Sequence, residues 1–274
     1  MLSQRALQDF IDIVWAHYET AGRHDLPWRL DVSPYSIVVS EVMLQQTQVA
    51  RVMTKYREFL AVFPDFSALA SAATPELLRV WQGMGYNRRA LFLQRLAQSV
   101  MNEYGGVLPG DPEILVKLPG IGKATASSIA AFAYNHPSAF IETNIRRVYI
   151  HHFFPSVAIV SDSDIMPLVA ATLPPQRSRE WYWALMDYGS QLAKEFVNPN
   201  RKSTHYKKQS KFSGSNREAR GQILKSLLDH GAMSQKGLIT VTGIADGRIE
   251  ESLIQLQSEG FIRRARGGAY ILVG

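Results

Sequence analysis

Two glutamates, Glu41 and Glu142, stand in surroundings that suit a carboxyl group to chemistry. Glu41 lies in the apolar stretch VVSEVML, and burial there would raise its pKa and favour a protonated group that can donate a proton. Glu142, in SAFIETNIRRVYI, lies where an apolar run meets the start of a helix, whose dipole and free N–H groups favour the charged form. The alternatives are an exposed helix position for Glu41 and ordinary helix-end electrostatics for Glu142.

The elements that must position these acids are mainly helices. Before residue 198, apolar residues recur three and four apart in several segments, and strand-like alternation is scarce. After it, REARGQILKSLLDHG, KGLITVTG and ADGRIEESLIQLQSEG predict three helices, and FIRRARGGAYILVG predicts a hairpin turning at Gly267 and Gly268. We therefore expect a mainly α fold with an all-helical domain over 1–197, a basic linker over 198–216 and a small winged helix-turn-helix domain over 217–274.

Composition limits the classes of protein that the chain can belong to. The 274 residues are 46% hydrophobic, and no run approaches the 18 apolar residues of a membrane span. The first residues lack the pattern of a signal or transit peptide, so we expect a cytoplasmic location and no membrane partner. The chain has no cysteine, which excludes disulfides, thiolate nucleophiles and iron–sulfur or zinc-thiolate sites.

Positive charge is concentrated in one stretch of the sequence. The whole chain carries +6, whereas residues 198–225 hold eight Lys or Arg against Glu218 alone, a net of +7, so the remainder sums to −1. A polyanionic partner would explain this distribution. The alternative is a solvated linker kept soluble by its charges.

The stretch LPGIGKATASSIAAF, residues 118–132, predicts a tight glycine turn followed directly by a helix. Gly120 and Gly122 add little bulk, so free N–H groups and the positive end of the helix dipole would face outward and suit a phosphate. An ordinary turn between helices is the alternative. The stretch resembles the hairpin of the helix-hairpin-helix DNA glycosylases.

Further motifs extend this resemblance to the MutY-type adenine DNA glycosylases. In the order and spacing of that family, the chain carries DLPWR (25–29), PYSIVVSEVMLQQTQVARV (34–52), GMGYNRRALFL (83–93), the hairpin, and IETNIRRV (141–148). SEVMLQQTQV is close to diagnostic of the family, and the likeness covers residues 8 to about 195. The resemblance implies a two-lobed helix-hairpin-helix DNA glycosylase domain that binds DNA across the cleft between its lobes.

The resemblance also implies roles for particular residues. Glu41 would protonate the departing base, and Glu142, where the family carries aspartate, would stabilise or attack the sugar. Ala124 occupies the position of the Schiff-base lysine of bifunctional relatives, and Lys123 would point about 100° away from it, so the chemistry would be monofunctional. The implied base pocket consists of Trp28, Arg29, Leu44, Val49, Ala124 and Trp183, and the implied DNA contacts are Gln45, Gln46, Tyr86, Gly120, Gly122 and Lys123.

Trp183 departs from the family, because adenine-specific members carry Gln or Glu where this chain has an indole with one donor and no acceptor. Either Trp183 turns into the core and Arg29, backbone groups and water read the adenine, or it stacks in the pocket and the preferred base has changed. We favour the core position.

Two larger departures concern the end of the chain. The family ends its helical domain with four cysteines around a [4Fe–4S] cluster, whereas this chain has the cysteine-free linker, in which Lys207, Lys208 and Lys211 are expected to hold phosphates. We therefore expect no metal and no cofactor. Residues 215–274 do not resemble the family's 8-oxoguanine-reading domain. The expected recognition helix, ADGRIEESLIQLQSEG, is acidic, which favours backbone contacts by the wing and linker, or a protein partner.

The sequence thus predicts a monofunctional, metal-free, monomeric, nucleoid-associated DNA glycosylase that removes adenine opposite 8-oxoguanine or guanine from double-stranded DNA. One alternative keeps the fold and changes the target to thymine or uracil opposite guanine. Another is a non-catalytic DNA-binding regulator that uses the winged helix.

Overall fold

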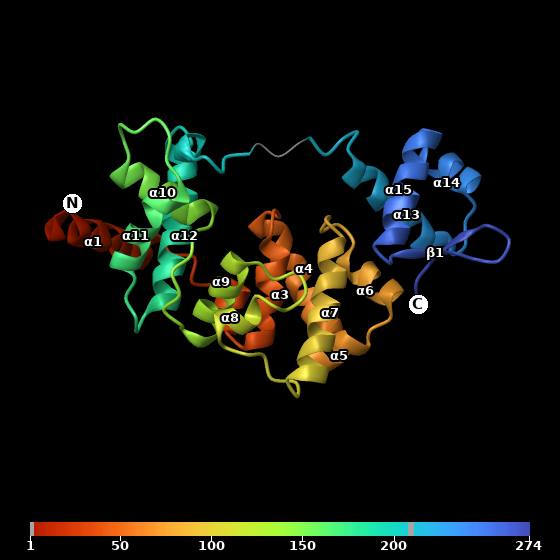
Figure 1. Ribbon diagram of the computed structural model, residues 1–274, viewed down its shortest axis with the longest axis horizontal. Helices are drawn as coiled ribbons and strands as arrows, with labels where there is room; N and C mark the ends of the chain where they lie inside the picture. Colours follow the sequence, from red (N-terminus) through yellow and green to blue (C-terminus); the bar gives the residue numbers. More distant parts are fainter. Residues whose placement is uncertain (1–2, 208–210) are drawn as a thin grey trace. The chain divides into compact units, whose positions relative to one another are not determined.

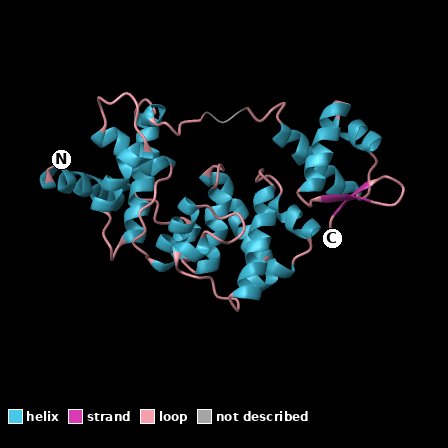
Figure 2. Cartoon of the chain, viewed as in Figure 1, coloured by secondary structure: helices cyan, strands magenta, loops and turns pink. Residues whose placement is uncertain are grey.

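The structure, a computed structural model, describes residues 3–207 and 211–274 and is mainly α-helical, as the sequence predicts (Figures 1 and 2). The chain divides into two compact units. Unit 1 consists of Met1–Glu41 and Pro109–Lys208, and unit 2 of Val42–Leu108 and Gln209–Gly274. These units group segments that are distant in the sequence, whereas the predicted boundaries at 197 and 216 follow the chain and stay a prediction.

Unit 1 is built around the helices α10 and α12, which pack side by side, with α1 packed on α12 (Figure 1). The unit also contains most of α3, whose last turn belongs to unit 2. Its elements are α1 (Gln4–Ala21), α2 (Pro27–Leu30), α3 (Pro34–Leu44), α8 (Pro112–Leu115), α9 (Lys123–Tyr134), α10 (Thr143–Phe153), α11 (Asp162–Thr172), α12 (Ser178–Glu195) and the 3-10 helix η1 (Pro199–Lys202).

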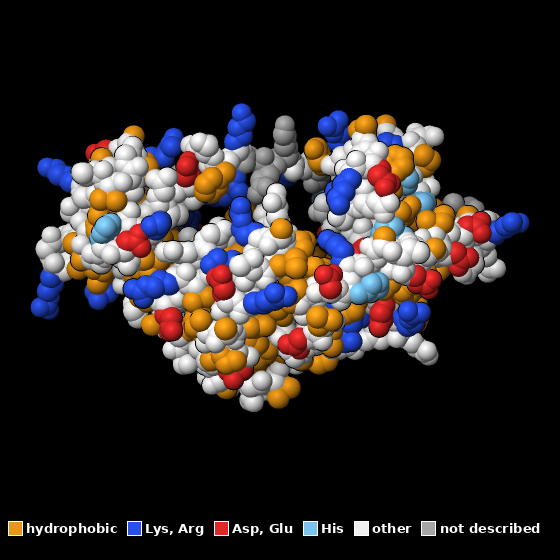
Figure 3. All heavy atoms as spheres, turned by 180° about the vertical axis from the view of Figure 1, so that it is seen from behind, with side chains coloured by type: hydrophobic (Ala, Val, Ile, Leu, Met, Phe, Trp, Pro, Cys, Tyr) orange, Lys and Arg blue, Asp and Glu red, His pale blue; other side chains and the backbone are white. Residues whose placement is uncertain are grey.

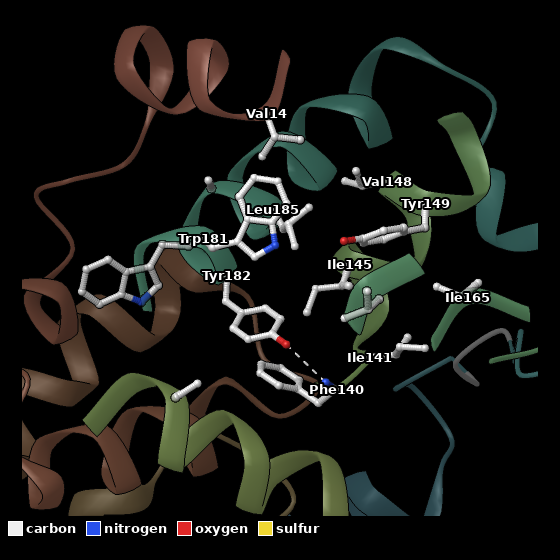
Figure 4. Packing of buried hydrophobic residues seen from close by; sticks show 14 of the residues in the cluster. Val14, Phe140, Ile141, Ile145, Val148, Tyr149, Ile165, Trp181, Tyr182 and Leu185 are labelled. Carbon is white, nitrogen blue, oxygen red and sulfur yellow. Dashed lines mark hydrogen bonds between the residues drawn. The ribbon is translucent and has the colours of Figure 1, made fainter. Parts of the chain in front are cut away.

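The core of unit 1 fixes the segment that leads into α10. Figure 4 shows the ring of Tyr182 against Phe140, and their ring centroids are 4.1 Å apart. The Tyr182 hydroxyl accepts a hydrogen bond from the backbone N–H of Phe140 at 3.3 Å and donates to the carbonyl of Ser138 at 2.7 Å. Because Phe140 lies two residues before Glu142, this packing holds the chain just ahead of that acid.

Helix α12 approaches the start of α10 so closely that only glycine fits at one position. A Cβ added to Gly189 would lie 2.5 Å from the carbonyl oxygen of Asn144, well inside contact distance. The absence of a side chain at Gly189 therefore allows the two helices to pack backbone to backbone beside the N-terminus of α10.

The start of the predicted basic linker is a packed part of unit 1 rather than a separate linker. Residues 198–204 include η1, and Asn200 is 4% exposed. The Asn200 side chain donates to the carbonyl of Thr143 at 2.9 Å, and the Lys202 ammonium donates to the carbonyls of Phe154 and Pro155 at 3.1 and 2.6 Å. Thr143 begins α10 and Phe154 caps its end. We call residues 198–204 the clasp, because they fasten both ends of α10.

Unit 2 combines a helical layer with the C-terminal residues. Helix α5 packs on α7, and α4 on α6. The helices of the first part are α4 (Val49–Val62), α5 (Phe66–Ser71), α6 (Thr74–Trp81) and α7 (Arg88–Glu103). The second part contains α13 (Asn216–His230), α14 (Gln235–Thr242), α15 (Asp246–Ser258), β1 (Ile262–Arg264) and β2 (Tyr270–Leu272).

Residues 216–274 have the element order expected of a winged helix-turn-helix. Three helices precede an antiparallel hairpin in which Arg263 pairs with Ile271. The hairpin turns at Gly267 and Gly268, as predicted, and both have the positive φ angles, 91° and 84°, that glycine adopts readily.

On the face shown in Figure 3, Lys and Arg side chains are interspersed with acidic ones. Within the described ranges, no helix is both long and apolar enough to cross a membrane.

Candidate active site

Glu41 lies on α3 among buried apolar residues and has one hydroxyl partner. Val38 and Val39 are fully buried and Val42 is 4% exposed. The hydroxyl of Ser128, on α9, is 2.5 Å from Oε2 of Glu41. Burial raises the pKa of Glu41 to about 7, while the Ser128 hydrogen bond lowers it and the charge of Glu142 raises it further. Glu41 therefore holds a proton through much of the neutral range.

Glu142 is the N-cap residue of α10, as the sequence predicts. Its Oε1 accepts hydrogen bonds from the backbone N–H groups of Asn144 at 2.7 Å and Ile145 at 3.1 Å. These bonds and the charges of Arg147 and Arg146 lower its pKa, but burial outweighs them and the net pKa is raised. We expected the helix N-terminus to favour the charged form of Glu142. Burial, which the local sequence did not indicate, instead raises its pKa.

The charge of Glu142 acts on Glu41, and the surroundings of the two carboxyl groups favour placing a proton on Glu41. Glu41 has the Ser128 hydroxyl as its hydrogen-bond partner, whereas Glu142 has two backbone N–H donors, the helix N-terminus and two arginine charges. A proton on Glu41 and a charge on Glu142 is the arrangement that these contacts stabilise. Such a pair can protonate a leaving group and stabilise a developing cation.

Arg147, a buried residue that we did not single out from the sequence, holds the first turn of α10 beside Glu142. Nη1 of Arg147 donates to Oδ1 of Asn144 at 2.8 Å and to the carbonyl of Gly189 at 2.7 Å. Asn144 in turn donates its backbone N–H to Glu142. The first turn of α10, on which Glu142 depends, is therefore held by α12 through Gly189 and by the clasp through Thr143. The motif IETNIRRV contains Arg147, but a charged residue on a helix predicts exposure, so its burial needed the structure.

The glycine hairpin lies between α8 and α9, as predicted. Gly120 has φ +77°, and Gly122 is the N-cap of α9 without a side-chain cap. A Cβ at Gly122 would meet nothing within 4 Å, and Gly120, Gly122, Lys123 and Ala124 are all exposed. The first N–H groups of α9 thus lack a side-chain cap and lie at an exposed turn, as an anion site requires.

Three of the expected pocket residues are packed into the interior of unit 1. Trp28 is 5% exposed, and Trp183 is 9% exposed and stacks on Phe132 with ring centroids 6.2 Å apart. Trp183 belongs to the buried core cluster, the position favoured from the sequence.

Arg29, which we expected to read the base, forms a buried ion pair with Asp187 instead. Its two terminal nitrogens donate to both oxygens of Asp187, at 2.7 and 2.9 Å, and to the carbonyls of Arg23 and Trp183. The Nε of Arg29 is buried and has no hydrogen-bond partner among the described residues. These contacts do not support base reading by Arg29, because two of its terminal N–H donors bond to Asp187 on α12 and the other two to backbone carbonyls.

The predicted DNA-contacting residues of unit 2 are held by Arg89, which sequence reasoning missed. Arg89 is 8% exposed, and it donates to the carbonyls of Val42, Met43, Gln45, Met84 and Gly85 and to the hydroxyl of Thr47. It thereby joins the end of α3 to the turn before α7. Gln46 and Tyr86 have positive φ angles, 55° and 47°, in these two segments. Leu44, Gln45, Val49 and Tyr86 are partly exposed and Gln46 is exposed.

Lys207 and Lys211 are exposed, and Lys208 lies outside the described residues. The described part of the chain contains no group of three or more His, Asp or Glu side chains placed to hold a metal ion. The residues present do not fit a cysteine-bound [4Fe–4S] cluster, because the chain has no cysteine and the clasp fills the region after α12 with amide and ammonium contacts.

Comparisons with known proteins agree with the motifs. A profile of the HhH-GPD superfamily of base excision DNA repair proteins matches residues 39–163. The adenine DNA glycosylase of Mycolicibacterium smegmatis is 31% identical over 271 residues, 92% of this chain and 92% of that protein. The adenine DNA glycosylase of Mycobacterium tuberculosis is 38% identical over 190 residues, 68% of this chain and 62% of that protein.

Among solved structures, a thermostable thymine-DNA glycosylase is similar with a TM-score of 0.60 and 25% identity, covering 68% of this chain and 87% of that one. The chain thus spans nearly all of the M. smegmatis relative but less than two thirds of the M. tuberculosis one. Because the first alignment covers 92% of the chain, it also takes in part of the segment after residue 197.

Proposed function

Because this chain belongs to the MutY-type adenine DNA glycosylases of the helix-hairpin-helix superfamily, we propose that it releases mispaired adenine from double-stranded DNA as a monofunctional repair enzyme. The base opposite the adenine in this proposal is 8-oxoguanine or guanine. The enzyme acts as a monomer in the cytoplasm, on nucleoid DNA, and without a metal or cofactor.

The observation that carries the proposal is the unequal pair of acids. Glu41 is buried with a pKa of about 7, and Glu142 is held by two N–H groups at the N-terminus of α10. Cleavage of a purine N-glycosidic bond needs a proton for the departing base and negative charge beside the sugar as oxocarbenium character develops. Glu41 can supply the proton and Glu142 the negative charge, and both residues belong to unit 1.

In the proposed reaction, the target adenine leaves the base stack and Glu41 donates its proton to a ring nitrogen of the base. The electrons of the N-glycosidic bond leave with the base, and Glu142 stabilises the positive charge that remains on the sugar. Water then adds to the anomeric carbon and gives up a proton to the carboxylate of Glu41, which restores the acid. Ala124 offers no amine, so no Schiff base forms and the product is an intact abasic strand.

We assign DNA binding to residues on both units. The glycine hairpin and Lys123 would bind backbone phosphate, and Lys207, Lys208 and Lys211 would add sequence-independent charge. Gln45, Gln46 and Tyr86 would fill and wedge the gap that the flipped nucleotide leaves. The strained backbone of Gln46 and Tyr86, held by Arg89, supports this assignment, since positive φ angles in non-glycine residues cluster at functional sites.

The test is release of adenine from labelled duplexes that carry adenine opposite 8-oxoguanine, guanine, cytosine or thymine, with alkaline cleavage of the abasic product. Adenine opposite 8-oxoguanine and guanine should be released and the adenine–thymine pair left intact. Strand cleavage should require the alkali. Glu41→Gln should abolish release while keeping mismatch binding, because the amide retains the shape and loses the acid. Absence of adenine release by the wild type would overturn the proposal.

The similarity to a thymine-DNA glycosylase structure favours a second candidate, thymine or uracil opposite guanine. The same assay with thymine and uracil duplexes separates the two. Trp183 in the core removes one reason to expect a changed base, so adenine stays the first choice. Binding to every duplex without release of any base would instead favour a non-catalytic regulator that uses the C-terminal helices and hairpin.

A further inference from the structure

Ser128 has two acceptors within reach of a single hydroxyl proton. It lies on α9 and is 4% exposed, and its Oγ is 2.5 Å from Oε2 of Glu41 and 3.0 Å from the carbonyl oxygen of Thr125. A hydroxyl has one proton, and a carbonyl oxygen can only accept. Ser128 therefore divides its donor between Glu41 and Thr125.

The charge on Glu41 decides which acceptor receives the proton. A hydrogen bond to an ionised carboxylate is roughly twice as strong as one to a neutral group. When Glu41 is neutral, the carbonyl of Thr125 competes for the donor, and when Glu41 is ionised, Oε2 receives it. Only the torsion about the Cβ–Oγ bond of Ser128 has to change, so the response requires no movement of the packed helices.

We propose that Ser128 is a positioning residue for base release: it occupies Oε2 of Glu41, keeps the transferable proton on Oε1, and stabilises the carboxylate as that proton leaves. The proposal rests on the role of Glu41 as proton donor given above. In the step itself, the proton passes from Oε1 to a nitrogen of the base, and the electron pair of the N-glycosidic bond stays with the base. The negative charge left on Glu41 is met by the Ser128 hydroxyl.

The other influences on Glu41 come from burial and from one acid. Within the described residues, Glu142 at the start of α10 is the titratable group whose charge acts on Glu41, and it raises the pKa. Arg146 and Arg147 act on Glu142 and lower its pKa. Ser128 is thus the group that lowers the pKa of Glu41 against burial and Glu142. Without its hydroxyl, the pKa must rise above about 7.

The experiment compares single-turnover adenine release against pH for the wild type and three variants. Ser128→Ala should move the alkaline limb of the profile up by about one to two pH units, the worth of one hydrogen bond to a charged group. Its plateau rate should fall roughly tenfold, a part of what a general acid supplies. Ser128→Thr keeps the hydroxyl and should restore the limb. Ser127→Ala removes a neighbouring hydroxyl about 100° away on the helix and should match the wild type.

A second measurement follows Glu41 directly and does not need activity. The carboxyl carbon of Glu41, labelled with ¹³C and assigned by its loss in Glu41→Gln, is titrated by NMR in the free protein. The midpoint in Ser128→Ala should lie above that of the wild type by the same shift as the limb. An unchanged midpoint, or one that Ser128→Thr does not restore, would overturn the role of Ser128 even if adenine is released. A shifted midpoint in a protein that releases no adenine would keep the Ser128–Glu41 coupling and reject the proposed function.

Discussion

The raised pKa that suits Glu41 to proton donation also means that its ionisation destabilises the folded protein above neutral pH. The variant Glu41→Gln should therefore be more stable than the wild type at such pH values. The pKa of Glu41 is raised from 4.5 to about 7, a difference of about 2.5 units. At 1.36 kcal/mol per unit, ionising Glu41 in the folded state costs about 3 kcal/mol more than in the unfolded chain. The glutamine variant has no such cost, because an amide does not ionise and can still bond to Ser128.

The direction follows from proton counting. Between about pH 4.5 and 7 the folded protein binds more protons at this site than the unfolded chain, so its stability falls as the pH rises. Below that window both states hold the proton and the contribution of Glu41 is unaffected. The stability advantage of Glu41→Gln over the wild type should therefore grow by about 2.5 kcal/mol from about pH 5 to about pH 8.5. Titrating groups that do not interact with Glu41 are common to both proteins and cancel in the difference.

Urea unfolding followed by tryptophan fluorescence suits this measurement. Four of the five tryptophans, Trp15, Trp28, Trp181 and Trp183, lie in unit 1, as Glu41 does, and Trp81 lies in unit 2. Glu103→Gln, which changes an exposed glutamate at the end of α7, serves as the control and should follow the wild type at each pH. A constant difference between Glu41→Gln and wild type across this range would refute the reasoning, because it would mean that Glu41 ionises in the folded protein as easily as in the unfolded chain.

Three further changes test Glu142, the lysines assigned to DNA binding, and the clasp. Glu142→Gln should slow base release by about 10²–10³-fold and shift the alkaline limb of the pH profile down, since the charge that raises the pKa of Glu41 is gone, whereas Glu142→Asp should stay active; an equally fast Gln variant would reduce Glu142 to a helix cap. Neutralising Lys207, Lys208 and Lys211 together should weaken binding to matched and mismatched duplex alike and lower the slope of log K against log salt by about 0.9 per lost contact, and an unchanged slope would mean that they do not touch DNA. Asn200→Ala should lower the free energy of unfolding of unit 1 by about 1–3 kcal/mol, because the carbonyl of Thr143 loses its buried donor, and a melting curve identical to that of the wild type would contradict this role.

The features that could be predicted from the sequence are those set by neighbouring residues. Helical periodicity gave the long helices, the paired glycines gave the hairpin turn, and the apolar residues around Glu41 correctly indicated its raised pKa. The N-cap position of Glu142 followed from the polar residues after it. Each of these depends on a window of a few residues, which is the range over which sequence patterns carry physical information.

The features that could not be predicted depend on partners far along the chain. Arg29 looked free to read a base, but its acceptor, Asp187, lies 158 residues later. Residues 198–204 have the polar, basic composition of a linker, yet Asn200 finds its acceptor at Thr143, 57 residues earlier. Arg89 is buried among several backbone carbonyls, and Arg147 bonds to the carbonyl of Gly189 and the side chain of Asn144. Neither set of acceptors has a local signature in the sequence.

The clasp makes two distant segments of unit 1 depend on each other in the folded protein. Asn200 and Lys202 bond to backbone carbonyls at the two ends of α10, so the formed helix sets the spacing of the two acceptors. The position of residues 198–204 in unit 1 therefore depends on α10. The clasp therefore links a segment late in the chain to the first turn of α10, and with it to the placement of Glu142.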